Sequence, residues 1–159
     1  MRQILTRLIP AVLVLCLTLT ACGGKESDSA AGYDPAATAQ ALLDSGAFTD
    51  ALDTTDKDTV AVLYGVEADR IVDCACYTSL SAGAEEIAVL TMADADSAKA
   101  AMAGLEARVA DQKAALESYQ PDEVSKLDNA ILTQSGNTVV LVVAADAEKA
   151  QSTLDGLSK

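Results

Sequence analysis

The chain has 159 residues, a formal net charge of −13, and neither histidine nor tryptophan. The lack of histidine excludes a serine–histidine triad and a histidine metal site. The strong negative charge repels nucleic-acid phosphates, so no nucleic-acid partner is expected. It also repels anionic lipid headgroups, so the folded part is expected to stand off a membrane surface rather than lie on it.

Residues 1–21 have the three zones of a bacterial export signal. Arg2 and Arg7 give a basic start, residues 8–20 form an apolar run, and small residues then precede Cys22. The run is shorter than the roughly 20 apolar residues that a transmembrane helix needs. An ordinary secretory signal is the alternative, but it needs no cysteine at the cleavage site.

The segment Leu19-Thr20-Ala21-Cys22 resembles the lipobox of bacterial lipoproteins. The resemblance implies a signal peptide over residues 1–21 and a covalent diacylglyceryl lipid on Cys22; no other cofactor is expected. Residues 22–32 lack large apolar side chains and cannot order by burial, so we expect a flexible tether there. Residues 33–159 would then form a single domain on the outer, extracytoplasmic face of the cell membrane.

The first part of this domain is predicted to be helical. Asp34 and Pro35 predict a helix start, because aspartate caps free amides and proline fits the first helical position. Gly46 is expected to end that helix. A short helical turn is expected at residues 48–52, and a further helix within residues 53–65.

Two β-hairpins follow. Residues 69–78 and 85–92 are rich in β-forming side chains and predict the first hairpin. Residues 127–134 and 138–145 predict the second. Residues 139–143 are apolar on both faces, which predicts a central strand.

A helix is expected after each hairpin. Apolar residues at helical spacing predict a long helix over residues 94–118, and Asp146 is expected to cap a final helix. Residues 88–105 and 140–157 align without gaps, with Gly104 opposite Gly156. We therefore expect an α+β fold, in which two β-hairpins of a ββα-ββα pseudo-repeat form a four-stranded antiparallel sheet. Both long helices would pack on one face, and the N-terminal helices would cover an edge or an end.

Several short motifs follow one another in a specific order. After the lipobox and the capped helix come Leu63-Tyr64-Gly65, Ala84-Glu85-Glu86-Ile87-Ala88-Val89, Tyr119-Gln120-Pro121, Lys126-Leu127 and the apolar strand over residues 139–143. Together they resemble a bacterial lipoprotein family catalogued as domain of unknown function 4358. The resemblance spans nearly the whole mature chain. It implies no activity, cofactor or catalytic residue, because none is known for the family.

Glu85 and Glu86 are the first candidate binding residues, because they begin a strand that is otherwise apolar. Neighbouring residues of a strand point to opposite faces, so the two carboxylates cannot form a facing acid–base pair. A solvated strand end is one interpretation. Pairing of one glutamate with a basic residue such as Arg108 or Lys126 is the other.

Tyr64 and Tyr119 are further candidates, since tyrosines often anchor interfaces, although packing at the ends of elements explains them as well. Aspartates cluster within residues 53–58 and 94–96. No Asp-x-Asp-x-Asp-Gly calcium loop is present, and helix capping accounts for several of these aspartates, so no metal site is predicted.

Cys74 and Cys76 are the two cysteines beyond the lipobox, and their spacing places both on one face of a strand. A disulfide between them would be strained, because their Cα atoms lie about 7 Å apart in a strand. Two small buried apolar side chains are one interpretation. A redox pair or a soft-metal site is the other.

The sequence thus favours a membrane-anchored binding or interaction module of the cell envelope, whose partner is an envelope protein, a peptide or a small solute. It offers no nucleophile–base set, so no catalytic residue is predicted. An envelope enzyme that uses Glu85 or Glu86 is the alternative, and it requires a pocket holding a carboxylate of raised pKa. Thiol redox chemistry at Cys74 and Cys76 is a third hypothesis.

Overall fold

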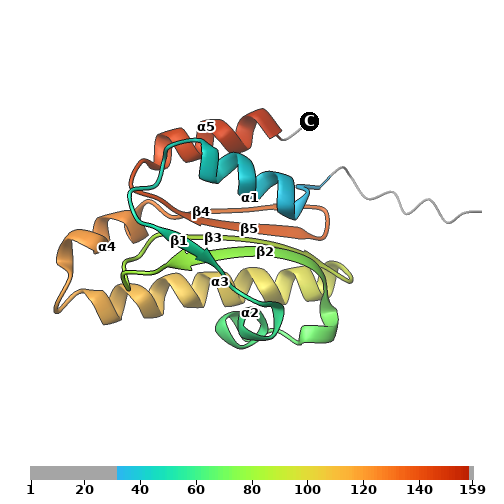
Figure 1. The fold of residues 1–159 in the computed structure, drawn as a ribbon. Helices are drawn as coiled ribbons and strands as arrows, with labels where there is room; N and C mark the ends of the chain where they lie inside the picture. The colour runs from blue at the N-terminus through green and yellow to red at the C-terminus, as the bar shows by residue number, and fades with distance from the viewer. Residues whose placement is uncertain (1–31, 158–159) are drawn as a thin grey trace, which may run out of the picture.

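The computed structural model describes residues 32–157, which form an antiparallel sheet between two layers of helices (Figure 1). The predicted signal peptide, Cys22 and most of the predicted tether lie outside the described residues. The elements in chain order are α1 (Pro35–Asp44), β1 (Leu52–Thr54), α2 (Lys57–Tyr64), η1 (Ala68–Arg70), β2 (Ile71–Ser79), β3 (Glu86–Met92), α3 (Ala95–Leu116), α4 (Pro121–Asp128), β4 (Ile131–Ser135), β5 (Thr138–Val143) and α5 (Ala147–Leu157). Within this region no helix combines the length and apolarity that crossing a bilayer requires.

The sheet has the strand order β1-β2-β3-β5-β4, and all neighbouring strands are antiparallel. The two predicted hairpins are confirmed as β2–β3 and β4–β5. The predicted central position of residues 139–143 is also confirmed, because β5 lies between β3 and β4 and all its residues are buried. The expected number of strands was wrong. Residues 52–54 form the edge strand β1 rather than a helical turn, which makes five strands.

Helices cover both faces of the sheet, as Figure 1 shows with α1 and α5 on one side and α2 and α3 on the other. The prediction that both long helices share one face was therefore wrong. The reason lies in β3 and β5, which present apolar side chains to both sides: Ile87 and Val142 pack in the α1–α5 layer, Leu90 and Leu141 in the α2–α3 layer. A sheet that is apolar on both faces needs cover on both.

The N-terminal helices do not cover an edge or an end of the sheet, as had been expected. Helix α1 packs beside α5 on one face, and α2 packs against α3 on the other. The second hairpin also begins later than predicted. Residues 121–128 form α4 with Pro121 in its first turn, so β4 begins only at Ile131.

The predicted caps Asp34 and Asp146 are confirmed, and Asp94 caps α3. Asp34 accepts a hydrogen bond from the Ala37 amide at 2.8 Å, Asp94 from Ser97 at 2.8 Å, and Asp146 from Lys149 at 3.0 Å. Each cap satisfies an amide that the first turn of its helix leaves free. These local contacts fix where the helices begin, and hence where their later turns meet the sheet.

Candidate functional site

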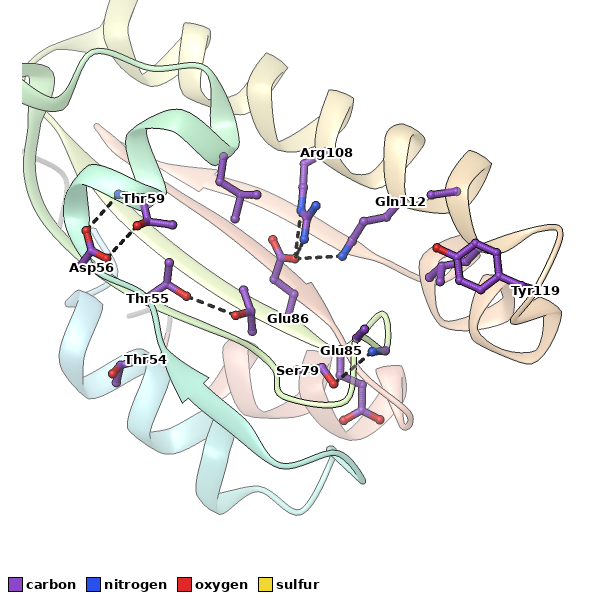
Figure 2. A pocket seen from close by; sticks show the side chains of 16 residues that line it. Thr54, Thr55, Asp56, Thr59, Ser79, Glu85, Glu86, Arg108, Gln112 and Tyr119 are labelled. Atoms are coloured by element: carbon purple, nitrogen blue, oxygen red, sulfur yellow. Dashed lines mark hydrogen bonds and ion pairs between the residues drawn. The ribbon is translucent and has the colours of Figure 1, made fainter.

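A pocket of about 560 Å³ opens between the start of α2, the β2–β3 turn and the C-terminal half of α3 (Figure 2). The hydroxyl groups of its wall belong to Thr54, Thr55, Thr59, Thr78 and Ser79. Its apolar lining includes Leu63 and Leu116. Ligand pockets commonly measure about 300–1,000 Å³, so this one can hold a small molecule or a short peptide segment.

Glu86 forms the floor of this pocket and is fully buried. Figure 2 shows Arg108 and Gln112 pointing from α3 toward its carboxylate. Arg108 donates to Oε2 from Nε at 3.2 Å and from Nη2 at 2.9 Å, and Gln112 Nε2 donates to the same oxygen at 3.3 Å. The Tyr64 hydroxyl donates to Oε1 at 2.7 Å. A buried carboxylate is tolerated here because a cation and two neutral donors surround it.

Tyr64 lies beneath the pocket at the end of α2 and is buried, which agrees with the predicted packing role. Burial raises the pKa of Tyr64 far above its ordinary value of 10.0, and the neighbouring Glu86 carboxylate adds to this shift. The hydroxyl therefore stays protonated and serves as a fixed donor to Glu86. Tyr119 has a different position, because it lies on the pocket rim and its side chain is 67% exposed. It is free to contact a ligand.

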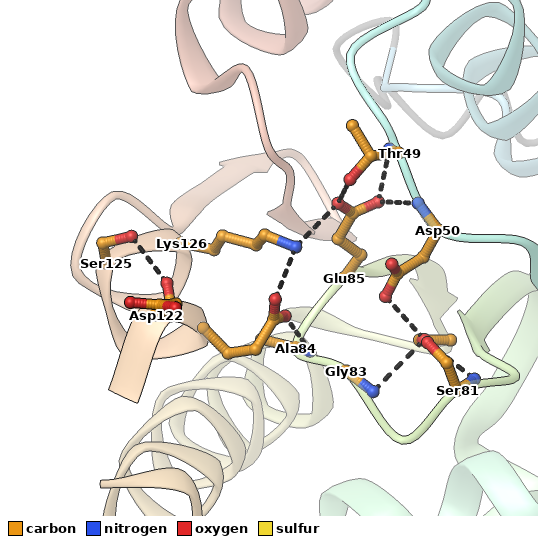
Figure 3. Close-up of polar contacts among 11 residues, drawn as sticks. Thr49, Asp50, Ser81, Gly83, Ala84, Glu85, Asp122, Ser125 and Lys126 are labelled. Atoms are coloured by element: carbon orange, nitrogen blue, oxygen red, sulfur yellow. Dashed lines mark hydrogen bonds and ion pairs between the residues drawn. The ribbon is translucent and has the colours of Figure 1, made fainter. Parts of the chain in front are cut away.

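Glu85 points away from Glu86, to the opposite side of the strand (Figure 2), and Figure 3 shows the partners of its carboxylate. Its carboxylate accepts hydrogen bonds from the amide of Thr49 at 2.9 Å, the hydroxyl of Thr49 at 2.6 Å, the amide of Asp50 at 3.0 Å and Lys126 Nζ at 3.0 Å. Burial alone would raise the pKa of Glu85, but these hydrogen bonds outweigh it and lower the pKa below 4.5. Glu85 therefore holds the loop after α1 and helix α4 against the start of β3.

Lys126 bridges two carboxylates at the edge of this network. Its Nζ lies 3.0 Å from Glu85 and 2.8 Å from Glu123, whose other oxygen accepts the amide of Ala84 at 2.8 Å. Burial would lower the pKa of Lys126, but the two carboxylates outweigh it and raise the pKa. The β2–β3 turn is thus fixed to α4 by backbone and side-chain contacts.

The interpretation of Glu85 and Glu86 as a solvated strand end was wrong, since both are buried. The alternative pairing is confirmed for both partners, Arg108 with Glu86 and Lys126 with Glu85. Sequence reasoning missed Gln112, although its position one helical turn after Arg108 is a usable signal. The threonine hydroxyls carried no such signal, because they come from β1, the loop after it, α2 and β2.

Asp56 lies at the pocket mouth and caps α2. It accepts hydrogen bonds from the Thr59 amide at 3.0 Å, the Thr59 hydroxyl at 2.7 Å and the Asp58 amide at 3.1 Å. The hydrogen bonds from Thr59 lower the pKa of Asp56, so its charge persists to lower pH than that of an ordinary aspartate. The charged residues that line the pocket are Asp56, Glu85, Glu86 and Arg108, but the carboxylate of Glu85 is directed to Thr49, Asp50 and Lys126.

Cys74 and Cys76 are both free thiols and lie away from this pocket, on β2. Cys76 is buried in the layer beneath α2 and α3, while Cys74 is half-buried at its margin. The interpretation as small buried side chains thus fits Cys76 better than Cys74. Among residues 32–157 no three histidine, cysteine or acidic side chains are grouped to hold a metal ion.

The fold and the pocket together define a small α+β domain with a polar, ligand-sized cavity whose floor is a buried ion pair. The chain belongs to the family described as Domain of unknown function (DUF4358), whose model matches residues 44–144. The matched segment contains both glutamates and their cations, Arg108 and Lys126, and it ends before α5. No match was found among curated proteins or among solved structures.

Proposed function

We propose that this protein is a membrane-anchored binding module of the cell envelope and that the pocket above Glu86 is its ligand site. The lipobox ending at Cys22 supports the anchor and the extracytoplasmic location. The pocket supports binding, because it is ligand-sized and its floor is preorganised by four hydrogen bonds to one buried carboxylate. That floor is the observation that carries the proposal.

The charges of the pocket restrict the class of ligand. Glu86 and Arg108 neutralise one another across 2.9 Å, and Lys126 lies between the carboxylates of Glu85 and Glu123. Asp56 is left as the unbalanced charge at the mouth, in a chain of net charge −13. We therefore propose a small polar solute or peptide segment that is neutral or cationic and rich in hydrogen-bonding groups. The exposed ring of Tyr119 offers it an apolar contact at the rim.

The alternative function, an envelope enzyme that uses Glu85 or Glu86, receives no support from this geometry. A general acid needs a pKa near the working pH, which for a carboxyl group means a raised value. Glu85 has a lowered pKa, and its carboxylate is hydrogen-bonded to the amides of Thr49 and Asp50 in the loop after α1 rather than directed into the pocket. The carboxylate of Glu86 accepts hydrogen bonds from Arg108, Gln112 and the protonated hydroxyl of Tyr64.

The anchor is tested by intact mass spectrometry of the product extracted from membranes of a bacterial host. We expect the mass of a chain that begins at Cys22 and carries a diacylglyceryl group. A Cys22→Ser variant should lose the lipid and leave the membrane fraction. A wild-type chain that keeps residues 1–21, or whose cysteine is bare, refutes the anchor.

The ligand site is tested with a variant that fills the pocket without touching Glu86. Ala115 lines the pocket, whereas Ala114, its neighbour on α3, is exposed outside it. Wild type, Ala115→Trp and the control Ala114→Trp are compared by thermal unfolding with neutral and cationic amino acids, di- and tripeptides, and hexoses as probes. A probe that binds in the pocket should stabilise both wild type and the control Ala114→Trp. Its affinity for Ala115→Trp should be lower by at least about tenfold.

A probe that binds wild type and Ala115→Trp equally well would show that ligands bind elsewhere. Failure of every probe to stabilise wild type would contradict the proposed class of small polar ligands. The matched tryptophan at position 114 separates blockage of the pocket from a general effect of a large side chain on α3.

A further inference from the structure

Arg108 has more hydrogen-bond donors than its ion pair uses. A guanidinium group carries five N–H donors in a planar fork. Nε and Nη2 each use one of them on Glu86, at 3.2 and 2.9 Å. The other three, two on Nη1 and one on Nη2, make no hydrogen bond with any of residues 32–157. The ion pair thus holds the guanidinium in place and leaves Nη1 available to a ligand.

These remaining donors are accessible from the pocket. Arg108 lines the pocket above Glu86, and its side chain is 23% exposed, whereas that of Glu86 is 1% exposed. Within the described part of the chain, Gln112 Oε1 is the one buried side-chain nitrogen or oxygen that lacks a hydrogen-bond partner. Nη1 of Arg108, which also lacks a partner, is therefore not buried. A donor that is already held in place loses little conformational freedom when an acceptor binds to it.

Gln112 supplies an acceptor beside these donors. Its Nε2 donates to Glu86 Oε2 at 3.3 Å, the oxygen that Arg108 also binds, so the two side chains lie next to one another (Figure 2). The carboxylate fixes the orientation of the Gln112 amide, because only its NH₂ end can donate. Oε1 is left without a donor, which is rare for a buried polar atom. Since Oε1 is covered in this structure, a ligand donor reaches it only after a side-chain adjustment in the pocket wall.

We propose that the ligand of this pocket carries a neutral amide group, whose carbonyl oxygen accepts hydrogen bonds from Arg108 and whose N–H donates to Gln112 Oε1. This assignment rests on the ligand site proposed above and names the chemical group that the site recognises. A carboxylate could also accept from Arg108, but Glu86 already neutralises that cation, and Asp56 at the mouth repels a further negative charge. An amide offers a donor and an acceptor without net charge. Peptides and N-acetyl sugars both contain this group.

The test compares probes that differ in an amide group. Isothermal titration calorimetry with the full chain in detergent measures the affinity of two pairs of probes. The first pair is the capped dipeptide N-acetyl-Ala-Lys-amide and n-pentylamine, which has the same single positive charge but no amide. The second pair is N-acetylglucosamine and glucose. We expect the amide-bearing member of at least one pair to bind at least about tenfold more tightly than its partner, as a hydrogen bond from a charged donor implies. The pair that shows this preference identifies a peptide or a sugar as the source of the amide.

Two variants test the assigned residues. Arg108→Lys keeps a cation beside Glu86, but an ammonium group lacks the second pair of donors that the guanidinium directs at a ligand. It should weaken binding of the amide-bearing probe by at least about tenfold. Gln112→Met removes Oε1 and should also weaken binding of that probe. Arg70→Lys is the matched control and should bind as wild type does, because Arg70 is paired with Asp94 outside this pocket.

Far-UV circular dichroism confirms the fold of each variant, and the probe pairs on wild type decide the matter if a variant fails to fold. Equal affinity for the amide-bearing and amide-free members of both pairs would overturn the amide assignment and leave the pocket as a ligand site of other chemistry. A folded Arg108→Lys or Gln112→Met variant with wild-type affinity for the amide-bearing probe would also overturn it. If none of the four probes binds wild type, the amide assignment falls together with the proposed class of small polar ligands.

Discussion

Glu85 and Glu86 are adjacent in the chain, yet their carboxylates lie on opposite sides of the sheet and bind different cations. Lys126 Nζ lies 3.0 Å from Glu85, and Arg108 Nη2 lies 2.9 Å from Glu86. Through Glu86 the start of β3 is joined to α2 and α3, and through Glu85 it is joined to α4 and the loop after α1. Two successive residues thus connect the sheet to elements of both helical layers.

The first prediction concerns the ion pair below the pocket. Glu86→Ala removes the partner of Arg108, whose side chain is only 23% exposed, and leaves its charge poorly solvated. Breaking a buried pair costs about 3–5 kcal/mol, and the partial exposure of Arg108 places this case at about 3 kcal/mol. Urea unfolding followed by circular dichroism measures the loss.

The double variant Glu86→Leu with Arg108→Met is the control for that loss. Replacing both charges with apolar groups of similar size should restore most of the stability, because no unpaired charge remains. If the double variant is as unstable as Glu86→Ala, the unpaired charge of Arg108 does not explain the loss of stability.

The second prediction concerns the hydroxyl of Tyr64. Tyr64→Phe removes the 2.7 Å hydrogen bond to Glu86 inside the core and changes the shape of the side chain very little. Loss of one donor to a buried charged acceptor should cost about 1.5–3 kcal/mol. Chemical denaturation measures this, with Tyr33→Phe as the control, since Tyr33 is only partly buried. A change below about 0.5 kcal/mol would mean that water replaces the hydroxyl.

The parts of the fold that local chemistry determines were predictable, and Asp34, Asp94 and Asp146 show why. Each caps its helix through an amide three residues away, so the sequence alone contains both partners. Strand β1 is different. Its three residues pair with residues 77–79 of β2, and nothing near them in the sequence signals a partner that distant.

The side of the sheet that each helix covers also depends on distant residues. The pattern of residues 139–143 indicated a strand that is apolar on both faces, but it could not assign α3 to one face and α5 to the other. In the site, Glu85 and Glu86 could be selected from the sequence because they are two adjacent acidic residues at the start of an otherwise apolar strand. Their burial depends on two cations, Arg108 in α3 and Lys126 in α4, which lie more than twenty residues away in the sequence.

The third prediction concerns pH. The folded-state pKa of Glu85 lies below its ordinary value of 4.5, so the unfolded chain binds its proton more readily. The stability that Glu85 contributes is therefore fully present above about pH 4.5 and is lost as the pH falls through the folded-state value. We expect the urea midpoint of wild type to fall between pH 7 and pH 3.

A Glu85→Gln variant isolates this contribution. It should be less stable than wild type at pH 7, and its urea midpoint should fall less steeply toward pH 3. Other carboxyl groups with lowered pKa that do not touch this network, namely Asp56, Asp94 and Asp146, remain in both chains and cancel in the comparison. Parallel pH curves for the two proteins would contradict the assignment.

The last prediction uses two glycines that the sequence repeat aligns, Gly104 in α3 and Gly156 in α5. A Cβ on Gly104 would overlap the backbone carbonyl of Tyr64, whereas a Cβ on Gly156 would meet nothing within 4 Å. Gly104 therefore allows α2 to approach α3 closely enough for Tyr64 to reach Glu86. Gly156 has no such role and only weakens its helix.

Gly104→Ala should destabilise the protein by about 1–2 kcal/mol, because overpacking against a backbone outweighs the gain in helix propensity of about 1 kcal/mol. Gly156→Ala should instead stabilise it by up to about 0.5 kcal/mol, since a gain in helix propensity is its main effect. Thermal and urea unfolding of the two variants give opposite signs if the α2–α3 contact is as close as described. Equal stabilisation by both substitutions would show that α2 can move away from α3 at little cost, and that the floor of the pocket is not rigidly held.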